Sequence, residues 1–215
     1  MRMEQTNAMT LPLIQHVERN PEVMRITVDQ YHRMIETGIL SEGTPYELIH
    51  GLIVRKDRSA VGEDRMTVGR EHIWCVKTLG RLDKKLERLG CHMQLQSPVI
   101  MSEQDEPEPD GAILLGDIDD YKLRKPAAKD TLCIIEVAES SLPYDRMEKL
   151  SLYANSQVAQ YIIINLPDRQ IEVHTNPQPG RGHYGSAVTL RLADKVKFMV
   201  PGNRTLEVAV KSLLP

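Results

Sequence analysis

Three charged residues stand where the sequence otherwise predicts an apolar core, and their types suit metal chemistry. Glu136 continues an apolar run, Asp110 follows a proline at the start of the apolar segment AILL, and Lys149 lies between two apolar segments. An ionised carboxylate buried without a partner costs several kcal/mol. Two neighbouring carboxylates also repel each other, and magnesium or manganese would relieve that repulsion. Such a metal can activate a water molecule and polarise a phosphoryl oxygen.

Lys149 allows two interpretations of this set. A lysine beside a metal can orient or deprotonate an attacking water, or stabilise a phosphate as a point charge. Alternatively, Glu136 and Lys149 form a buried salt bridge without a catalytic role. Spacing alone does not choose between these interpretations.

The segment from Thr131 to Leu166 must position these residues, and it is typical of a strand, a helix and a second strand. Its first apolar run predicts a strand covered on both faces. Between the strands, Asp145, Lys149 and Tyr153 follow one another at a spacing of one helical turn. Because such units close as crossovers onto the same sheet, we expect this polar stripe to face the strand end with Glu136.

The remaining patterns predict elements on both sides of this unit. Thr27 is a suitable N-cap for a helix, and His50-Gly51 suits the turn of a β-hairpin that carries Glu47. Apolar spacing predicts a long helix from Thr67 to Leu89, ended by Gly90, with His72 near its start; a structural role is the simpler interpretation of a lone histidine. The C-terminal LEVAVKSLL predicts a short helix. Together these elements predict an α/β domain with a mixed sheet flanked by helices.

Length and composition predict one domain, residues 23–215, after a flexible arm at residues 1–22. The 215 residues carry a net charge of −3, which gives no overall attraction to nucleic acid or anionic membranes. There is no apolar run of membrane-spanning length and no signal-peptide pattern, so we expect a cytoplasmic protein that does not contact a membrane. The 3 cysteines form no CxxC pair and are expected to be reduced.

Contact with DNA would therefore need local positive charge. Two basic stretches lie near the expected site, and each is either a solvated loop or a DNA-binding segment. Their residues are Arg55, Lys56 and Arg58 in the first stretch, and Lys122, Arg124 and Lys125 in the second.

The segments YELIHG, PDGAILL and IIEVAESSLPYDRMEKLSLYANSQVAQYIIINL resemble the Uma2 family, also called DUF820, of restriction-endonuclease-like proteins with the PD-(D/E)xK nuclease fold. The resemblance spans Ile26 to Leu214. It implies a site of Asp110, Glu136 and Lys149, with Glu47 as a further carboxylate. It also implies auxiliary positions, namely His72, Asp145 and Tyr153.

One position departs from the general nuclease motif. The motif's lysine lies two residues after the glutamate, where this chain has Ala138. The resemblance therefore implies that the lysine has migrated, with Lys149 as the candidate. We expect a magnesium- or manganese-dependent endonuclease that hydrolyses DNA. A catalytically inactive interaction module and a hydrolase of smaller phosphate esters are the alternatives, and a homodimer is left open.

Overall fold

The computed structural model describes residues 23–41, 43, 45–55 and 69–215. The expected N-terminal arm lies outside these residues, so its flexibility stays a prediction. The elements of the described residues position the charged side chains.

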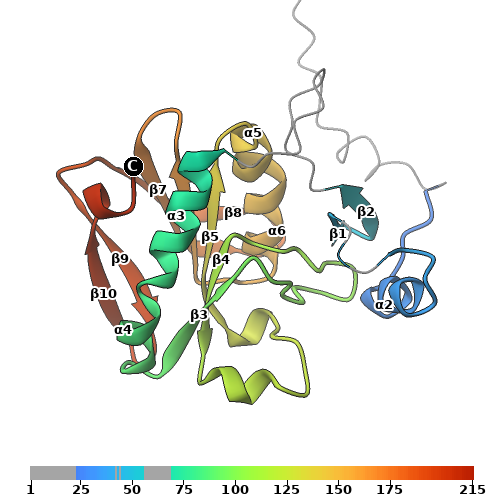
Figure 1. The fold of residues 1–215 in the computed structure, drawn as a ribbon. Coiled ribbons are helices and arrows are strands. Elements are labelled where there is room, and N and C mark those ends of the chain that lie inside the picture. The colour runs from blue at the N-terminus through green and yellow to red at the C-terminus, as the bar shows by residue number, and fades with distance from the viewer. Residues whose placement is uncertain (1–22, 42, 44, 56–68) are drawn as a thin grey trace, which may run out of the picture.

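A six-stranded sheet in the order β3-β4-β5-β6-β7-β8 forms the centre of the protein (Figure 1). Only β5 and β6 are parallel, and the other neighbours are antiparallel. The predicted mixed sheet flanked by helices is therefore confirmed. The strands are β3 (Cys91–Leu95), β4 (Gly111–Leu115), β5 (Thr131–Ala138), β6 (Gln160–Asn165), β7 (Gln170–Gln178) and β8 (His183–Leu190).

The crossover between β5 and β6 is helical, as its spacing predicts, but it is not a regular α-helix. It consists of α5 (Leu142–Tyr144), a π-helical turn (Asp145–Lys149) and α6 (Leu150–Asn155). At the end of that turn, the Leu150 N–H donates to the carbonyl of Asp145, five residues earlier. Such single π turns are frequent at functional sites.

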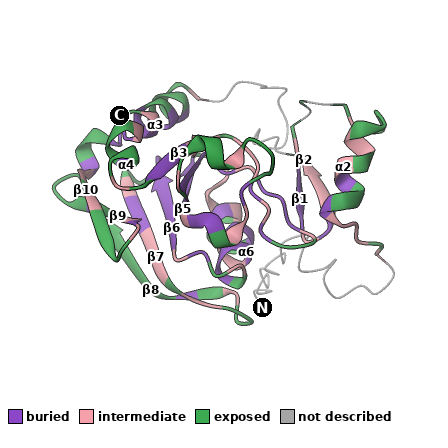
Figure 2. Cartoon of the chain, turned by 90° about the horizontal axis from the view of Figure 1, so that it is seen from below, coloured by how far each residue is buried: buried purple, intermediate pink, exposed green. Residues whose placement is uncertain are grey.

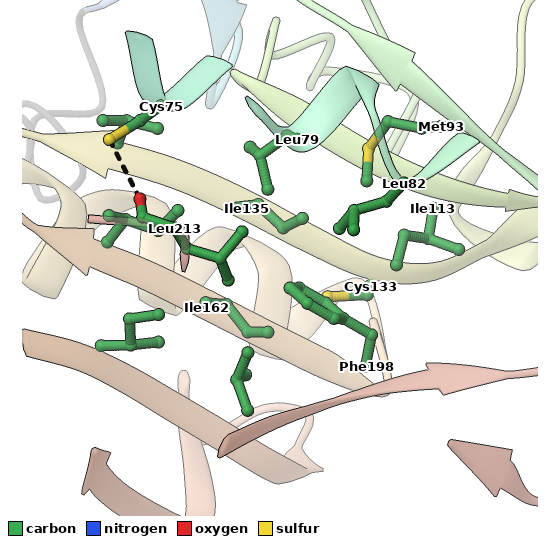
Figure 3. Close-up of a cluster of buried hydrophobic side chains, with 14 of the residues drawn as sticks. Cys75, Leu79, Leu82, Met93, Ile113, Cys133, Ile135, Ile162, Phe198 and Leu213 are labelled. Atoms are coloured by element: carbon green, nitrogen blue, oxygen red, sulfur yellow. Dashed lines mark hydrogen bonds between the residues drawn. The ribbon is translucent and has the colours of Figure 1, made fainter. Parts of the chain in front are cut away.

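The alternation of β5 divides the core into two layers. Cys133, Ile135 and Val137 pack with α3 (Arg70–Gly80) and β9 (Lys195–Val200), and Figure 3 shows part of this layer. Ile134 and Ala138 pack on the other face, against α6. Glu136 lies between Ile134 and Ala138 in the alternation, so its side chain faces the crossover helix.

The predicted helix from Thr67 to Leu89 is wrong as a single element. Thr67 lies outside the described residues, and the remainder forms α3 (Arg70–Gly80) and α4 (Asp83–Glu87). Gly80 is a poor helix former, and a Cβ at this position would lie 3.1 Å from Leu95 of β3, so the glycine permits close packing at the break. Gly90, with φ +84°, follows α4 as expected.

The N-terminal elements form a separate layer beside the sheet, with a small core of their own. Thr27 caps α2 (Val28–Glu36), as expected, and Gln30 completes a capping box with it. The strands β1 (Tyr46–Ile49) and β2 (Leu52–Arg55) form the predicted hairpin around His50-Gly51. Ile49 packs into the layer that contains α6, and Glu47, two residues earlier on the same strand face, points the same way.

The C-terminal helix prediction is wrong for most of its length. β9 (Lys195–Val200) and β10 (Arg204–Ala209) form an antiparallel hairpin, followed by a 3-10 turn at Val210–Ser212. The sequence LEV alternates apolar and charged residues, a period of two that is typical of a strand rather than a helix. Figure 2 shows the contrast between buried β5 and β6 and the largely exposed β8 and β10.

Candidate active site

Asp110 and Glu136 lie opposite each other on neighbouring strands. Gly111 pairs with Ile135 across β4 and β5, so the register continued by one residue brings Asp110 opposite Glu136. The backbone N–H of Asp110 lies 3.4 Å from Oε2 of Glu136. The two residues are 1% and 0% exposed, so the expected pair of carboxylates is present and enclosed.

Lys149 reaches this pair from the crossover helix. Its Nζ donates to Oε2 of Glu47 at 2.8 Å and lies 3.3 Å from Oε1 of Glu136. Burial lowers the pKa of the Lys149 ammonium, but the charges of Glu136 and Glu47 outweigh burial and raise the pKa above its usual value. The ammonium therefore stays charged. The structure contains the ion pair between Glu136 and Lys149 that was one interpretation of the sequence, and Glu47 is its third member.

Tyr153 also faces Glu136. Its hydroxyl donates to Oε1 of Glu136 at 2.9 Å, and burial, together with the Glu136 charge, holds the pKa of the phenol well above its usual value. Two of the three residues of the expected polar stripe, Lys149 and Tyr153, therefore face Glu136. Asp145 instead accepts a hydrogen bond from Ser141 at 2.6 Å, and its carbonyl accepts one from Tyr161.

His72 approaches Asp110 from the first turn of α3, the helix on the other side of the sheet. Its Nε2 lies 3.0 Å from Oδ2 of Asp110, and the same oxygen accepts the backbone N–H of Val137 at 2.8 Å. The structure therefore brings together Asp110, Glu136, Lys149, Glu47, Tyr153 and His72. Sequence reasoning missed the Val137 N–H donor, which only the register of β4 on β5 reveals.

Asp110 and Glu136 are suitable ligands for magnesium or manganese. Among the described residues, no group of three or more histidine, cysteine, aspartate or glutamate side chains surrounds one metal position. Magnesium does not require such a group, because it binds through one or two carboxylates and completes its shell with water and substrate phosphate. A pair of carboxylates meets that requirement.

The second basic stretch, which we call the basic patch (Lys122, Arg124 and Lys125), lines a cavity of about 450 Å³. The patch lies between two 3-10 turns, Ile118–Tyr121 and Ala128–Asp130. Each cation has an acidic partner, so the positive charge of the patch is partly neutralised; the partners are Asp119, Asp130 and Glu106, in that order. Arg55 ends β2, whereas Lys56 and Arg58 lie outside the described residues.

The fold and the enclosed cluster of carboxylates and lysine define a nuclease-like α/β protein. A crystal structure described as that of "a putative nuclease belonging to DUF820" from Anabaena variabilis ATCC 29413 is similar to this chain, with a TM-score of 0.61 and 15% identity, covering 87% of this chain and 97% of that one. A match at this identity supports the fold.

The family follows from the sequence itself. The model of the Uma2 family, described as "Putative restriction endonuclease", matches residues 28–209, and the chain belongs to this family. Membership supports a nuclease. No curated protein matches the sequence significantly. Among the described residues, no helix is long and apolar enough to cross a membrane.

Proposed function

We propose that this protein is a magnesium- or manganese-dependent endonuclease that hydrolyses DNA phosphodiester bonds with water as the nucleophile. The observation that carries the proposal is the position of the Lys149 ammonium, 2.8 Å from Glu47 and 3.3 Å from Glu136. A lysine in this position supplies from the helix the charge that Ala138 of β5 cannot supply from the strand.

The residues divide into ligands and groups that orient them. Asp110 and Glu136 would hold the metal, which when bound supplies Lewis acidity and neutralises charge on the phosphate. Lys149, enclosed between two carboxylates, is suited to stabilise charge on the reacting phosphate. His72 orients the Asp110 carboxylate, and Tyr153 orients that of Glu136, through the contacts described above.

The burial of the cluster favours one rival function. Glu136 and Lys149 are 0% and 2% exposed, and an enclosed ion pair of this kind also suits a non-catalytic interaction module. Calorimetric titration with manganese separates the two functions. An enzyme should bind manganese with heat that disappears in Asp110→Asn and Glu136→Gln, whereas a module should show no such heat.

A plasmid-nicking assay tests the proposal directly. We expect supercoiled plasmid to be nicked or linearised with magnesium or manganese, and to stay intact with EDTA. Asp110→Asn and Glu136→Gln should abolish cleavage while the circular dichroism spectrum is retained. Equal cleavage by wild type and both variants, or no cleavage by wild type under any metal condition, contradicts the proposal.

A further inference from the structure

The hydroxyl group of Tyr144 has a property that sets it apart from the other tyrosines of its layer. Tyr153, Tyr161 and Tyr184 each donate to an oxygen of the protein, at 2.9, 3.0 and 3.0 Å. The Tyr144 hydroxyl is buried and has no hydrogen-bond partner among the residues that the structure describes. Buried polar groups are nearly always hydrogen-bonded, so an exception requires an explanation, such as a ligand.

Tyr144 lies beside the charged cluster. It is the N-cap residue of the π turn that ends at Lys149, and Lys149 and Glu47 are both close enough for their charges to act on its hydroxyl. Burial raises the pKa of the Tyr144 phenol far above its usual value; the positive charge of Lys149 opposes this shift, and the negative charge of Glu47 adds to it. The hydroxyl therefore stays protonated next to the site, where it can donate a hydrogen bond to an incoming acceptor.

We propose that the Tyr144 hydroxyl binds the substrate by donating a hydrogen bond to a non-bridging oxygen of the scissile phosphate. This inference rests on the proposed function, because it assigns a second donor, beside Lys149, to the same phosphate. Glu47 and Glu136 already surround Lys149, so a neutral donor adds recognition of the phosphate without a further buried charge.

Tyr144→Phe removes only this hydroxyl, and Tyr184→Phe is its matched control. Tyr184 belongs to the same layer, but its hydroxyl donates to the carbonyl of Val158. We expect Tyr144→Phe to lower kcat/KM for plasmid cleavage about 10- to 100-fold, the effect of losing one hydrogen bond to a charged group. Its thermal midpoint should equal or exceed that of wild type. Tyr184→Phe should show the reverse, with a lower midpoint and unchanged kcat/KM.

A loss of thermal stability in Tyr144→Phe as large as that in Tyr184→Phe would overturn the inference, because the hydroxyl would then have a structural partner such as a buried water. Equal kcat/KM for Tyr144→Phe and wild type would also overturn it, while the proposed function stands.

If wild type cleaves no DNA, the proposed function fails and a second measurement decides on Tyr144. Inorganic phosphate with manganese should then raise the thermal midpoint of wild type more than that of Tyr144→Phe. Equal shifts in the two proteins, including no shift in either, would overturn the role of Tyr144 as a phosphate donor.

Discussion

Replacing Lys149 by methionine should impair both catalysis and stability, because methionine keeps an unbranched side chain but removes the charge. The ammonium lies 2.8 Å from Glu47 and 3.3 Å from Glu136. At an effective dielectric constant of about 20, these distances correspond to gross attractions of about 6 and 5 kcal/mol. Desolvation of the buried ions offsets much of this, and removing one partner of a buried pair typically costs about 3–5 kcal/mol.

A cost of that size is a large share of the roughly 5–15 kcal/mol that stabilises an ordinary domain. Urea denaturation of the metal-free protein should therefore show a lower free energy of unfolding for Lys149→Met. Manganese should restore part of the difference, because a divalent cation replaces the missing positive charge. Turnover in manganese, measured where the variant is folded, should fall by about 10²–10⁴-fold, the range typical of a positioned catalytic group.

Returning the lysine to the strand provides the decisive comparison. Ala138 is fully buried on the same face of β5 as Glu136, so Ala138→Lys alone overpacks the core and should cost about 1–3 kcal/mol. Lys149→Ala vacates space near Glu136. The double variant Ala138→Lys/Lys149→Ala should therefore lose less stability than Ala138→Lys alone, and it should recover part of the turnover. Unchanged turnover and a stability change below about 1 kcal/mol in Lys149→Met would refute this reasoning about the migrated lysine.

Further predictions concern the metal, DNA binding and pH. Asp110→Asn should eliminate manganese-dependent heat in calorimetry, and manganese binding equal to that of wild type would remove Asp110 from the metal site. Charge reversal in the basic patch should flatten the salt dependence of DNA affinity by about 0.9 units for each DNA phosphate that the patch no longer neutralises; an unchanged slope would make the patch a solvated loop. Although burial raises the pKa of Glu172, hydrogen bonds from Arg146 and Asn165 outweigh it and hold the pKa below its ordinary value of 4.5. The stability that these hydrogen bonds provide is present above pH 4.5 and disappears as pH falls through the lowered value, so Arg146→Met should be destabilised at neutral pH and match wild type in acid, as measured by urea denaturation.

The elements predicted correctly are those that local patterns determine. The apolar run of β5, the N-cap at Thr27 and the His50-Gly51 turn each depend on a few neighbouring residues. The long helix failed at Gly80, where tertiary packing against Leu95 of β3 favours a break over continuous apolar spacing. No local pattern reveals that packing.

The meeting of Glu47 and Lys149 lies beyond local patterns as well. The two residues are 102 positions apart in the sequence, and they meet because the hairpin packs on the layer that contains α6. Only the family resemblance suggested Glu47. The spacing of the polar stripe, by contrast, correctly predicted that Lys149 and Tyr153 face Glu136, because both lie at or after the end of the π turn, where α-helical spacing holds.

Asp145 does not join them, because its carboxylate has a partner within the crossover helix. Helical spacing assigns Asp145 and Lys149 to one face because four residues complete slightly more than one α-helical turn. In the structure, the Asp145 carboxylate instead accepts a hydrogen bond from Ser141, the N-cap residue of α5. Tyr144 directly precedes Asp145, and its buried hydroxyl has no hydrogen-bond partner among the described residues. With Asp145 held by Ser141, the Tyr144 hydroxyl that we propose as a donor adds no charge to a site that already holds the carboxylates of Asp110, Glu136 and Glu47, which suits a site that must admit a phosphate.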